Sequence, residues 1–303
     1  MVILPSYAGG GAEKVLLSFI SKNTSKSIDI KLFVVNSIGP LKKIAPVDAI
    51  EFKNKHFIFS LPSLIVEIRK NKIDVLISTF PNTSAILLFL KKIGVHNCRI
   101  IVRQPNMVEP SLSKTLKLRL LKYFYKKFII YTDLLIVTSE AMKKESLKNK
   151  VKKNKIRLLR NPIDSFFLRK NVIPIRKPHK GIKLVFVGRI VFQKGLDRIL
   201  PAIKKVKNIK LTIIGSGNEK EPLIKIINQL GIEDKVEFLG YIEKPGEIVA
   251  GSDYFIIPSR WEGLPNSVLE SLALGTPVIA FSEVVGLKDF RKNISDKSIL
   301  IVN

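Results

Sequence analysis

The sequence predicts an α/β protein made of two Rossmann-like domains that face each other across a cleft. Short apolar segments of strand type alternate with longer segments of helical periodicity, which is typical of parallel sheets covered by helices. The alternation starts twice, each time with a strand that leads into a glycine turn, first "VILPSYAGGGAEK" and later "KLVFVGRIVFQKG". A length of 303 residues exceeds one average domain and agrees with two.

The first domain is predicted over residues 1–170. Its expected strands are short, apolar and followed by polar or glycine-rich turns: Val2–Pro5, Ile30–Val35, Val75–Thr79, Ile100–Arg103 and Leu134–Thr138. Its expected helices are Ala12–Ser21, Leu61–Lys70 and the basic, amphipathic Lys114–Asp133. The stretch Asn161–Gly181 has three prolines, a basic run and no clean periodicity, so we expect it to link the domains.

The second domain is predicted over residues 171–303. Its expected strands are "KLVFVG", "KLTIIG", "VEFLG", "YFIIPS" and "PVIAF". We expect helices between them, near Gly195–Lys207, Glu221–Leu230, Pro245–Ala250 and Asn266–Leu274. Ligands of such domains bind at the carboxyl ends of the strands, which places the candidate site in the cleft.

Composition narrows the function classes. The net charge is +27, and residues 1–170 carry most of it, with 32 basic against 11 acidic residues. This excess favours an anionic partner such as a phosphorylated substrate or a membrane surface, and a generally Lys-rich composition is the other reading. The single cysteine, Cys98, excludes a disulfide framework. The basic half lacks a nucleic-acid-binding module or a run of stacking aromatics, so we expect no nucleic acid partner.

The strand that opens the second domain leads into a candidate anion site. Gly188 allows a sharp turn, Arg189 follows it, and Lys194 stands where the next helix is expected to begin. Cations beside a helix start suit a diphosphate, although two solvated cations at a strand end would look the same. A second glycine turn, with Gly215 and Gly217, follows the next strand and is expected to line the same pocket.

The stretch "EGLPNSVLE" places two acids around one helix start. Glu262 precedes the helix that Pro265 or Asn266 begins, and Glu270 lies about one turn inside it. Ionised carboxylates accept hydrogen bonds and hold diols. A ligand composed of a sugar, a diphosphate and a ribose therefore matches two acids separated by a cationic middle. Taken alone, either glutamate also fits a favourable interaction with the helix dipole.

These motifs resemble the GT-B glycosyltransferases of family four. The resemblance rests on "VGRIVFQKG", "GSG", "VEFLGYI" and "PSRWEGLPNSVLESLALGTPVIA", and it covers nearly all of the chain. It is specific in residues 183–281 and looser in residues 1–170, where "GGGAEK" and "LLRNPID" match. The family implies a retaining enzyme that takes sugars from nucleotide diphosphates.

Roles follow from the resemblance, position by position. Arg189 and Lys194 would bind the donor diphosphate, and Glu262 would contact the transferred sugar; these three are the expected catalytic residues. Glu270 would hold the ribose. The remaining expected donor contacts are glycines and turn residues: Gly10, Gly11, Gly188, Gly215, Gly217, Gly263, Leu264 and Pro265.

The chain departs from the family pattern in two places. Many members have a histidine after the fourth strand, where this chain has "IVRQPNMVE"; Arg103 and Asn106 are the residues expected to contact the acceptor or the phosphates there. Members also run further and end in helices, whereas this chain ends at "SILIVN". We therefore expect a truncated second domain.

The sequence thus predicts a retaining hexosyltransferase. It would move a sugar from a nucleotide diphosphate sugar, by analogy a UDP-sugar, to a glycan or lipid-linked acceptor in surface polysaccharide synthesis. No Asp-x-Asp triplet is present, so we expect no metal and no cofactor. We expect a cytoplasmic protein, peripheral on the anionic inner face of the plasma membrane. The alternative is an inactive or truncated GT-B subunit that binds another glycosyltransferase.

Overall fold

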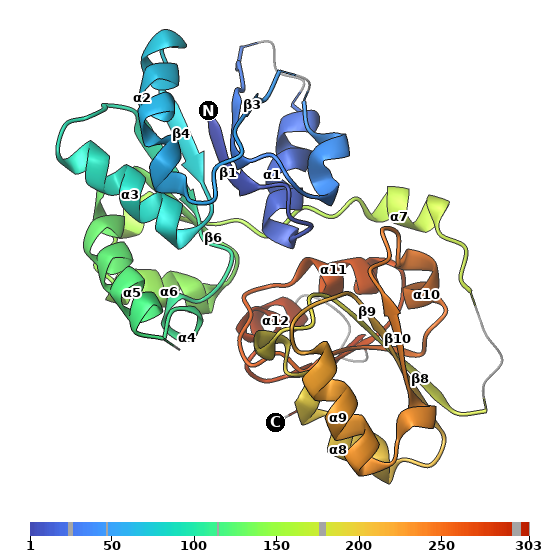
Figure 1. Cartoon of the computed structure of the whole chain (residues 1–303). Coiled ribbons are helices and arrows are strands. Elements are labelled where there is room, and N and C mark those ends of the chain that lie inside the picture. Colours follow the sequence, from blue (N-terminus) through green and yellow to red (C-terminus); the bar gives the residue numbers. More distant parts are fainter. Residues whose placement is uncertain (24–26, 47, 114, 176–179, 293–297, 303) are drawn as a thin grey trace. The chain divides into compact units, whose positions relative to one another are not determined.

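The computed structural model describes all residues except 24–26, 47, 114, 176–179, 293–297 and 303. The chain divides into two compact units, Met1–Asn161 and Pro162–Asn303 (Figure 1). Each unit is a parallel sheet with helices on both faces, as the alternating sequence pattern predicts.

The first unit is built on a seven-stranded sheet of order β3-β2-β1-β4-β5-β6-β7. Its strands are β1 (Val2–Ser6), β2 (Leu32–Asn36), β3 (Ile50–Glu51), β4 (Val75–Ser78), β5 (Arg99–Arg103), β6 (Leu134–Val137) and β7 (Ile156–Leu158). The helices are α1 (Gly11–Ser21), α2 (Leu61–Lys70), α3 (Pro81–Lys92), α4 (Val108–Ser111), α5 (Leu116–Phe128) and α6 (Glu140–Lys148). This strand order is that of the Rossmann fold and reverses between β1 and β4.

The second unit repeats this order in a six-stranded sheet, β10-β9-β8-β11-β12-β13. Its strands are β8 (Ile182–Val187), β9 (Ile209–Ile214), β10 (Val236–Gly240), β11 (Tyr254–Ile257), β12 (Val278–Phe281) and β13 (Ile299–Val302). Its helices are α7 (Ser165–Asn171), α8 (Leu200–Lys205), α9 (Lys220–Leu230), α10 (Gly246–Ala250), α11 (Asn266–Ala273) and α12 (Val285–Arg291). Here the order reverses between β8 and β11, where ligands of Rossmann folds bind.

Alternation along the strands explains the two-sided cores. In β8, Leu184 and Phe186 face one core cluster, while Val185 between them faces the other. In β1, likewise, Ile3 belongs to one core cluster, while Val2 and Leu4 belong to another. Both faces of each sheet are covered by helices, so successive side chains are buried on opposite sides.

The boundary between the units lies earlier than the predicted one at 170/171, after Asn161. The predicted linker contains α7, which packs against α11, and Arg169 Nε donates to the Ala273 carbonyl at 2.7 Å. These contacts assign α7 to the second unit. Part of the predicted linker, residues 176–179, lies outside the described residues.

Two predicted helices differ from the observed ones. The helix expected near Gly195–Lys207 begins as two 3-10 turns and becomes α-helical only at Leu200. The helix expected over Lys114–Asp133 is α-helical over Leu116–Phe128, with the Thr115 hydroxyl accepting from the Leu118 N–H as its cap; Lys114 lies outside the described residues. None of the described helices is long and apolar enough to cross a bilayer.

Candidate functional site

The loop after β8 holds two cations in different environments. Arg189 is exposed, and its guanidinium forms no hydrogen bond or ion pair with the described residues. Lys194 is only 9% exposed and stands at the end of the short 3-10 turn Phe192–Lys194. The first cation is available to a ligand in solution, whereas the second is part of a packed structure.

Lys194 is paired with Glu262, the first acid of "EGLPNSVLE". The lysine Nζ donates to Glu262 Oε1 at 2.6 Å, and their side chains are only 11% and 8% exposed. Gln193 Nε2 donates to the same oxygen at 3.2 Å and to the Trp261 carbonyl at 3.0 Å. The structure thereby joins the loop after β8 to the loop after β11, on either side of the point where the strand order reverses.

Arg260, in the loop after β11, also contacts the segment that follows β8. Its guanidinium forms two hydrogen bonds with the Asp197 carboxylate, at 2.8 and 2.5 Å, and lies 3.9 Å from the Phe192 ring centroid. Its backbone N–H donates to the Gln193 carbonyl at 2.8 Å. The hydrogen bonds from Arg260 lower the pKa of Asp197, so the pair is fully charged at neutral pH.

The glycine turn after β9 has a packing reason of its own. Gly215 has φ +142°, and a Cβ there would lie 1.9 Å from the Gly188 carbonyl oxygen. At Gly217 a Cβ would lie 2.1 Å from the Ile190 carbonyl oxygen. The two loops therefore touch through backbone alone, and both positions require glycine whether or not a ligand is present.

The other predicted residues of the second unit surround the same strand ends. Gly263, Leu264 and Pro265 are buried between β11 and α11, and the Gly286 N–H donates to the Gly263 carbonyl at 2.9 Å. The helix begins at Asn266, with Pro265 in the N-cap position. Glu270 is half-buried, about one turn inside α11. The structure thus places all predicted residues of this unit on the β8, β9 and β11 loops and α11.

In the first unit, Arg103 ends β5 and is buried. Its Nη2 donates to Asn161 Oδ1 at 2.5 Å, and its Nη1 donates to Thr79 Oγ1 at 3.3 Å. Burial lowers the pKa of Arg103 to about 10, while the carboxylate of Glu13 opposes that change. Arg103 therefore remains a cation at neutral pH.

Glu13 is a buried acid that sequence reasoning did not single out. It is 8% exposed and lies in the first turn of α1, which Gly10 and Gly11 open. A Cβ at position 10 would lie 2.4 Å from Glu13 Oε2, so Gly10 leaves room for this carboxylate. Gly10 thus leaves space for the Glu13 carboxylate, and the charge of that carboxylate favours the cation of Arg103 after β5.

The segment that contains Asn106 is held by another buried acid, Glu145 of α6. Its carboxylate accepts from the backbone N–H groups of Val108 and Glu109, at 2.9 and 2.8 Å. It also accepts from Gln104 Nε2 at 3.2 Å, and the Tyr125 hydroxyl donates to Gln104 Oε1 at 3.1 Å. Burial raises the pKa of Tyr125, which keeps its hydroxyl a donor.

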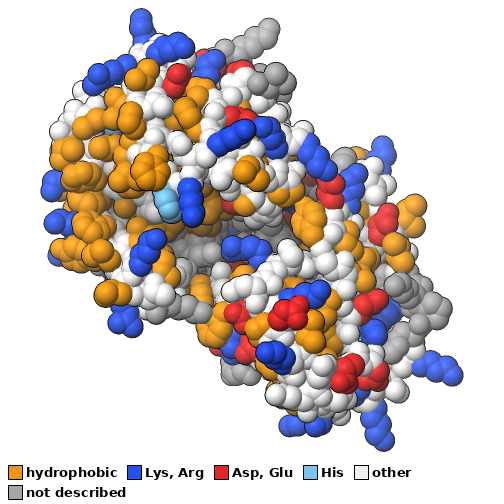
Figure 2. Space-filling model, viewed as in Figure 1, with side chains coloured by type: hydrophobic (Ala, Val, Ile, Leu, Met, Phe, Trp, Pro, Cys, Tyr) orange, Lys and Arg blue, Asp and Glu red, His pale blue; other side chains and the backbone are white. Residues whose placement is uncertain are grey.

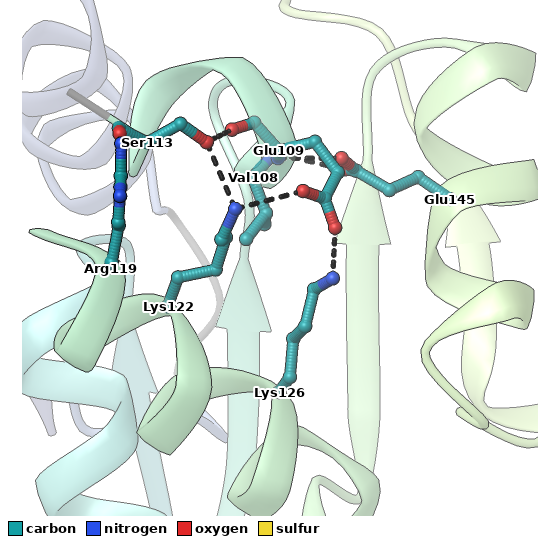
Figure 3. Close-up of polar contacts among 7 residues, drawn as sticks. All are labelled: Val108, Glu109, Ser113, Arg119, Lys122, Lys126 and Glu145. Carbon is teal, nitrogen blue, oxygen red and sulfur yellow. Dashed lines mark hydrogen bonds and ion pairs between the residues drawn. The ribbon is translucent and has the colours of Figure 1, made fainter.

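Figure 3 shows how this segment continues into α5. Lys122 and Lys126 both bind the Glu109 carboxylate, with Lys122 Nζ at 3.0 Å. Their hydrogen bonds lower the pKa of Glu109. Glu145 and Glu109 together connect α6, α4 and α5. The segment that contains Asn106 is therefore held in place by contacts with α5 and α6, which lie later in the chain.

Sequence reasoning treated Lys194 and Glu262 as separate ligand contacts, and it did not identify Gln193, Glu13 or Glu145 as contributors. Burial cannot be read from a single charged letter in a loop; the available signal was the isolation of each acid among apolar residues. Among the described residues, no group of three or more His, Cys, Asp or Glu side chains could hold a metal ion.

Two family models match this chain, one over most of each unit. Residues 9–165 match the model of Glycosyltransferase Family 4, and residues 169–301 match that of Glycosyl transferases group 1. The amylovoran biosynthesis glycosyltransferase AmsD of Erwinia amylovora is 26% identical over 296 residues, covering 94% of this chain and 80% of the relative. An uncharacterized glycosyltransferase of Methanocaldococcus jannaschii is 36% identical over 196 residues, covering 58% of this chain and 46% of the relative. For the first curated relatives, the matches span 46%, 29% and 48% of their length.

Solved structures show the same fold. HepE of Anabaena, crystallised with UDP and glucose, superposes with a TM-score of 0.77 at 16% identity, covering 100% of this chain and 84% of HepE. WaaG, a glycosyltransferase involved in lipopolysaccharide biosynthesis, superposes with a TM-score of 0.74 at 14% identity, covering 99% and 85%. Both units thus have the Rossmann-like topology of GT-B enzymes, as predicted. The first family model alone matches more than half of the sequence, and the chain belongs to glycosyltransferase family 4.

Proposed function

We propose that this protein is a retaining glycosyltransferase of surface polysaccharide synthesis. It transfers a sugar from a UDP-sugar to a glycan or lipid-linked acceptor. Relatives similar in sequence are named for lipopolysaccharide and amylovoran biosynthesis, and HepE, which has a similar fold, was crystallised in complex with UDP-glucose. The observation that carries the proposal is the buried Lys194–Glu262 pair where the strand order of the second unit reverses.

The charges suit cleavage of a sugar–phosphate bond. As the anomeric C–O bond breaks, its electrons move to the leaving diphosphate oxygen, and fixed cations stabilise that charge. Lys194 is oriented by Glu262 through one of its three N–H donors, which leaves two for phosphate oxygens. Arg189 supplies a guanidinium that can fork two of them. The acceptor oxygen attacks from the same face, and its proton passes to the leaving phosphate.

The remaining contacts follow the same assignment. Glu262 and the turn of Gly263, Leu264 and Pro265 bind the transferred sugar, and Glu270 binds the ribose. In the first unit, Arg103 and Asn106 bind the acceptor or the phosphates, and the Gly10–Gly11 loop binds the donor. We propose that no metal is needed, since the two cations neutralise the diphosphate. Turnover with the same rate before and after chelation by EDTA is the expected result.

Arg189→Ala is the sharpest test of the reaction. The side chain is exposed and unpaired among the described residues, so its removal should change unfolding free energy by less than about 0.5 kcal/mol. Loss of one charge-stabilising donor should lower the turnover number by roughly 10²–10³-fold. The exposed Lys225→Ala variant is the matched control.

Release of UDP from UDP-sugars measures the rate, and NMR of the product gives the anomeric configuration. A folded Arg189→Ala protein with wild-type turnover would refute the assignment. An inverted product would refute retention. Binding of UDP without turnover by any donor and acceptor pair would favour the inactive partner subunit instead.

We further propose that the first unit binds an anionic membrane from the cytoplasmic side, as a peripheral protein. α3 and α5 pack together, and these helices with Ile93, the residue after α3, carry exposed large apolar side chains: Phe89, Ile93, Leu116, Leu120, Tyr123 and Phe124. Figure 2 shows hydrophobic side chains gathered, with basic ones among them, on the side of this unit where α3 and α5 lie in Figure 1. Lys127 lies 5.9 Å from the Tyr123 ring centroid. Apolar side chains beside cations suit a lipid interface.

Flotation with phosphatidylglycerol vesicles tests this surface. Replacing Leu116, Leu120 and Tyr123 by serine should reduce the bound fraction, because each of these side chains is more than half exposed. Tyr241→Ser, 54% exposed in the second unit, is the control. Binding that ignores both salt and the triple substitution would refute the membrane proposal while leaving the transfer reaction untouched.

A further inference from the structure

Gln193 has contacts to which the proposed transfer reaction assigns no role. It lies in the 3-10 turn Phe192–Lys194 of the loop after β8 and is half-buried. Its backbone carbonyl accepts from the Arg260 N–H at 2.8 Å. Its side-chain Nε2 donates to the Trp261 carbonyl at 3.0 Å and to Glu262 Oε1 at 3.2 Å. Gln193 is therefore hydrogen-bonded to three consecutive residues of the loop after β11.

The partners of the side-chain amide fix its direction. The Trp261 carbonyl can only accept, and Glu262 Oε1 already accepts from Lys194 Nζ at 2.6 Å. The amide atom of Gln193 that contacts these two oxygens must therefore be the nitrogen, and each of its two hydrogens has an acceptor. A rotated amide would place its oxygen against two acceptors and would lose both hydrogen bonds.

The amide oxygen of Gln193 remains available to a ligand. Gln193 Oε1 forms no hydrogen bond with any described residue, and it is not one of the buried atoms that lack a partner, so part of its surface is accessible. It is bonded through a single carbon to the nitrogen that holds Glu262. An accessible acceptor beside a carboxylate that binds a sugar can accept from a hydroxyl of the same sugar.

We propose that Gln193 is a further residue of the nucleotide-sugar site, which positions Glu262 and binds a hydroxyl of the transferred sugar. The inference rests on the proposed transfer reaction, in which Glu262 contacts that sugar. Nε2 of Gln193 holds Glu262 Oε1 beside Lys194, and Oε1 of Gln193 accepts from the sugar hydroxyl. Free UDP has no sugar for either contact, so Gln193 contributes to the binding of UDP-sugars and not to that of UDP.

Gln193→Met tests this distinction. The substitution removes both polar atoms of the side chain and keeps its approximate length and the net charge. Calorimetry on the full chain gives dissociation constants for UDP, UDP-glucose, UDP-galactose and UDP-N-acetylglucosamine. We expect UDP to bind within about threefold of its wild-type affinity, and the UDP-sugar that the wild type binds best to bind about tenfold more weakly, as for a lost hydrogen bond with a charged group. A purely structural role would instead lower the urea midpoint and weaken both ligands equally.

Gln193→Glu tests the direction of the amide. At about pH 8 the new carboxylate lies against Glu262 and donates no hydrogen bond, so UDP-sugar affinity should fall at least as far as in Gln193→Met. At about pH 5 one proton shared by the two carboxyl groups restores a donor between them, and the affinity relative to the wild type should recover by about threefold or more. Gln229→Glu, the same change at an exposed position of α9, is the matched control and should follow the wild type at both pH values.

The neighbouring charged groups are Lys194, Arg260 and Asp197, and they are the same in every variant. Comparison with the wild type at the same pH therefore removes their contribution. Equal changes for UDP and UDP-sugar in Gln193→Met, or no change for either, would overturn the role at the sugar. A Gln193→Glu protein that does not recover in acid would overturn the positioning of Glu262. A wild-type chain that binds none of the three UDP-sugars would overturn the proposed transfer reaction, and this inference with it.

Discussion

Replacing Lys194 by methionine should strongly destabilise the second unit. The substitution keeps the approximate volume of the side chain and removes its charge, which leaves the Glu262 carboxylate buried without its cation, although Gln193 Nε2 still donates to it. Both partners are about nine-tenths buried, so the attraction that is lost is poorly screened. Removing one member of such a pair costs about 3–5 kcal/mol.

The only tryptophan of the chain provides the assay. Trp261 is adjacent to Glu262, and its ring centroid lies 6.3 Å from that of Phe192, so its fluorescence reports on this unit. Urea unfolding followed at Trp261 avoids treating a two-unit chain as a single transition. With a urea dependence of about 2 kcal/mol per molar, a loss of about 4 kcal/mol lowers the midpoint by roughly 2 M.

A double-mutant cycle separates the pair from the packing of each side chain. Glu262→Gln alone should also destabilise, whereas Lys194→Met with Glu262→Gln should recover much of the loss, since no uncompensated charge is then buried. Lys225→Met, at an exposed position, is the control. A midpoint for Lys194→Met within about 0.5 M of the wild-type value would refute the reasoning.

Three further outcomes are expected. Glu145→Ala leaves two amides at the start of α4 without their acceptor, so exchange of the Val108 amide, measured by mass spectrometry, should accelerate by about tenfold or more; unchanged exchange would contradict the role of this carboxylate. Arg260 lowers the pKa of Asp197, so the ion pair stabilises the fold at pH values above the ordinary aspartate pKa of about 4. This contribution, of about 1 kcal/mol or less, is lost as the pH falls through the lowered pKa. The urea midpoints of the wild type and of Asp197→Asn should therefore converge in acid. Glu270→Gln should weaken UDP binding in calorimetry by roughly tenfold or more with little change in unfolding, and full affinity would refute the ribose assignment.

Most strands could be predicted from the sequence because buried parallel strands are short apolar runs between turns. β1 and β8 show this clearly, and the glycine turns after them mark the carboxyl edge. β3 and β7 were missed because they have only two and three residues and little apolar pattern of their own. α7 was taken for linker because its packing on α11 depends on a helix about a hundred residues away.

The sequence selects the residues of the candidate site, but it does not predict how they contact one another. Chemistry and family resemblance select Arg189, Lys194 and Glu262, yet no spacing rule states that Lys194 and Glu262 bind each other while Arg189 stays exposed. Such pairs depend on how two loops, 68 residues apart, meet at the edge of one sheet. Glu145 was not identified for the same reason, because the residues that donate to its carboxylate lie 36 to 41 positions earlier in the chain.

The backbone contact between Gly215 and Gly188 has a consequence for recognising inactive relatives. Any protein that keeps these two loops at this separation must retain glycine at position 215, even after it has lost every ligand. A preserved glycine turn therefore reports the survival of a fold, and carries no information about catalytic competence. Under the proposed assignment, loss of chemistry would be visible first at Arg189, an exposed side chain that the described fold does not require and that an inactive descendant could exchange freely.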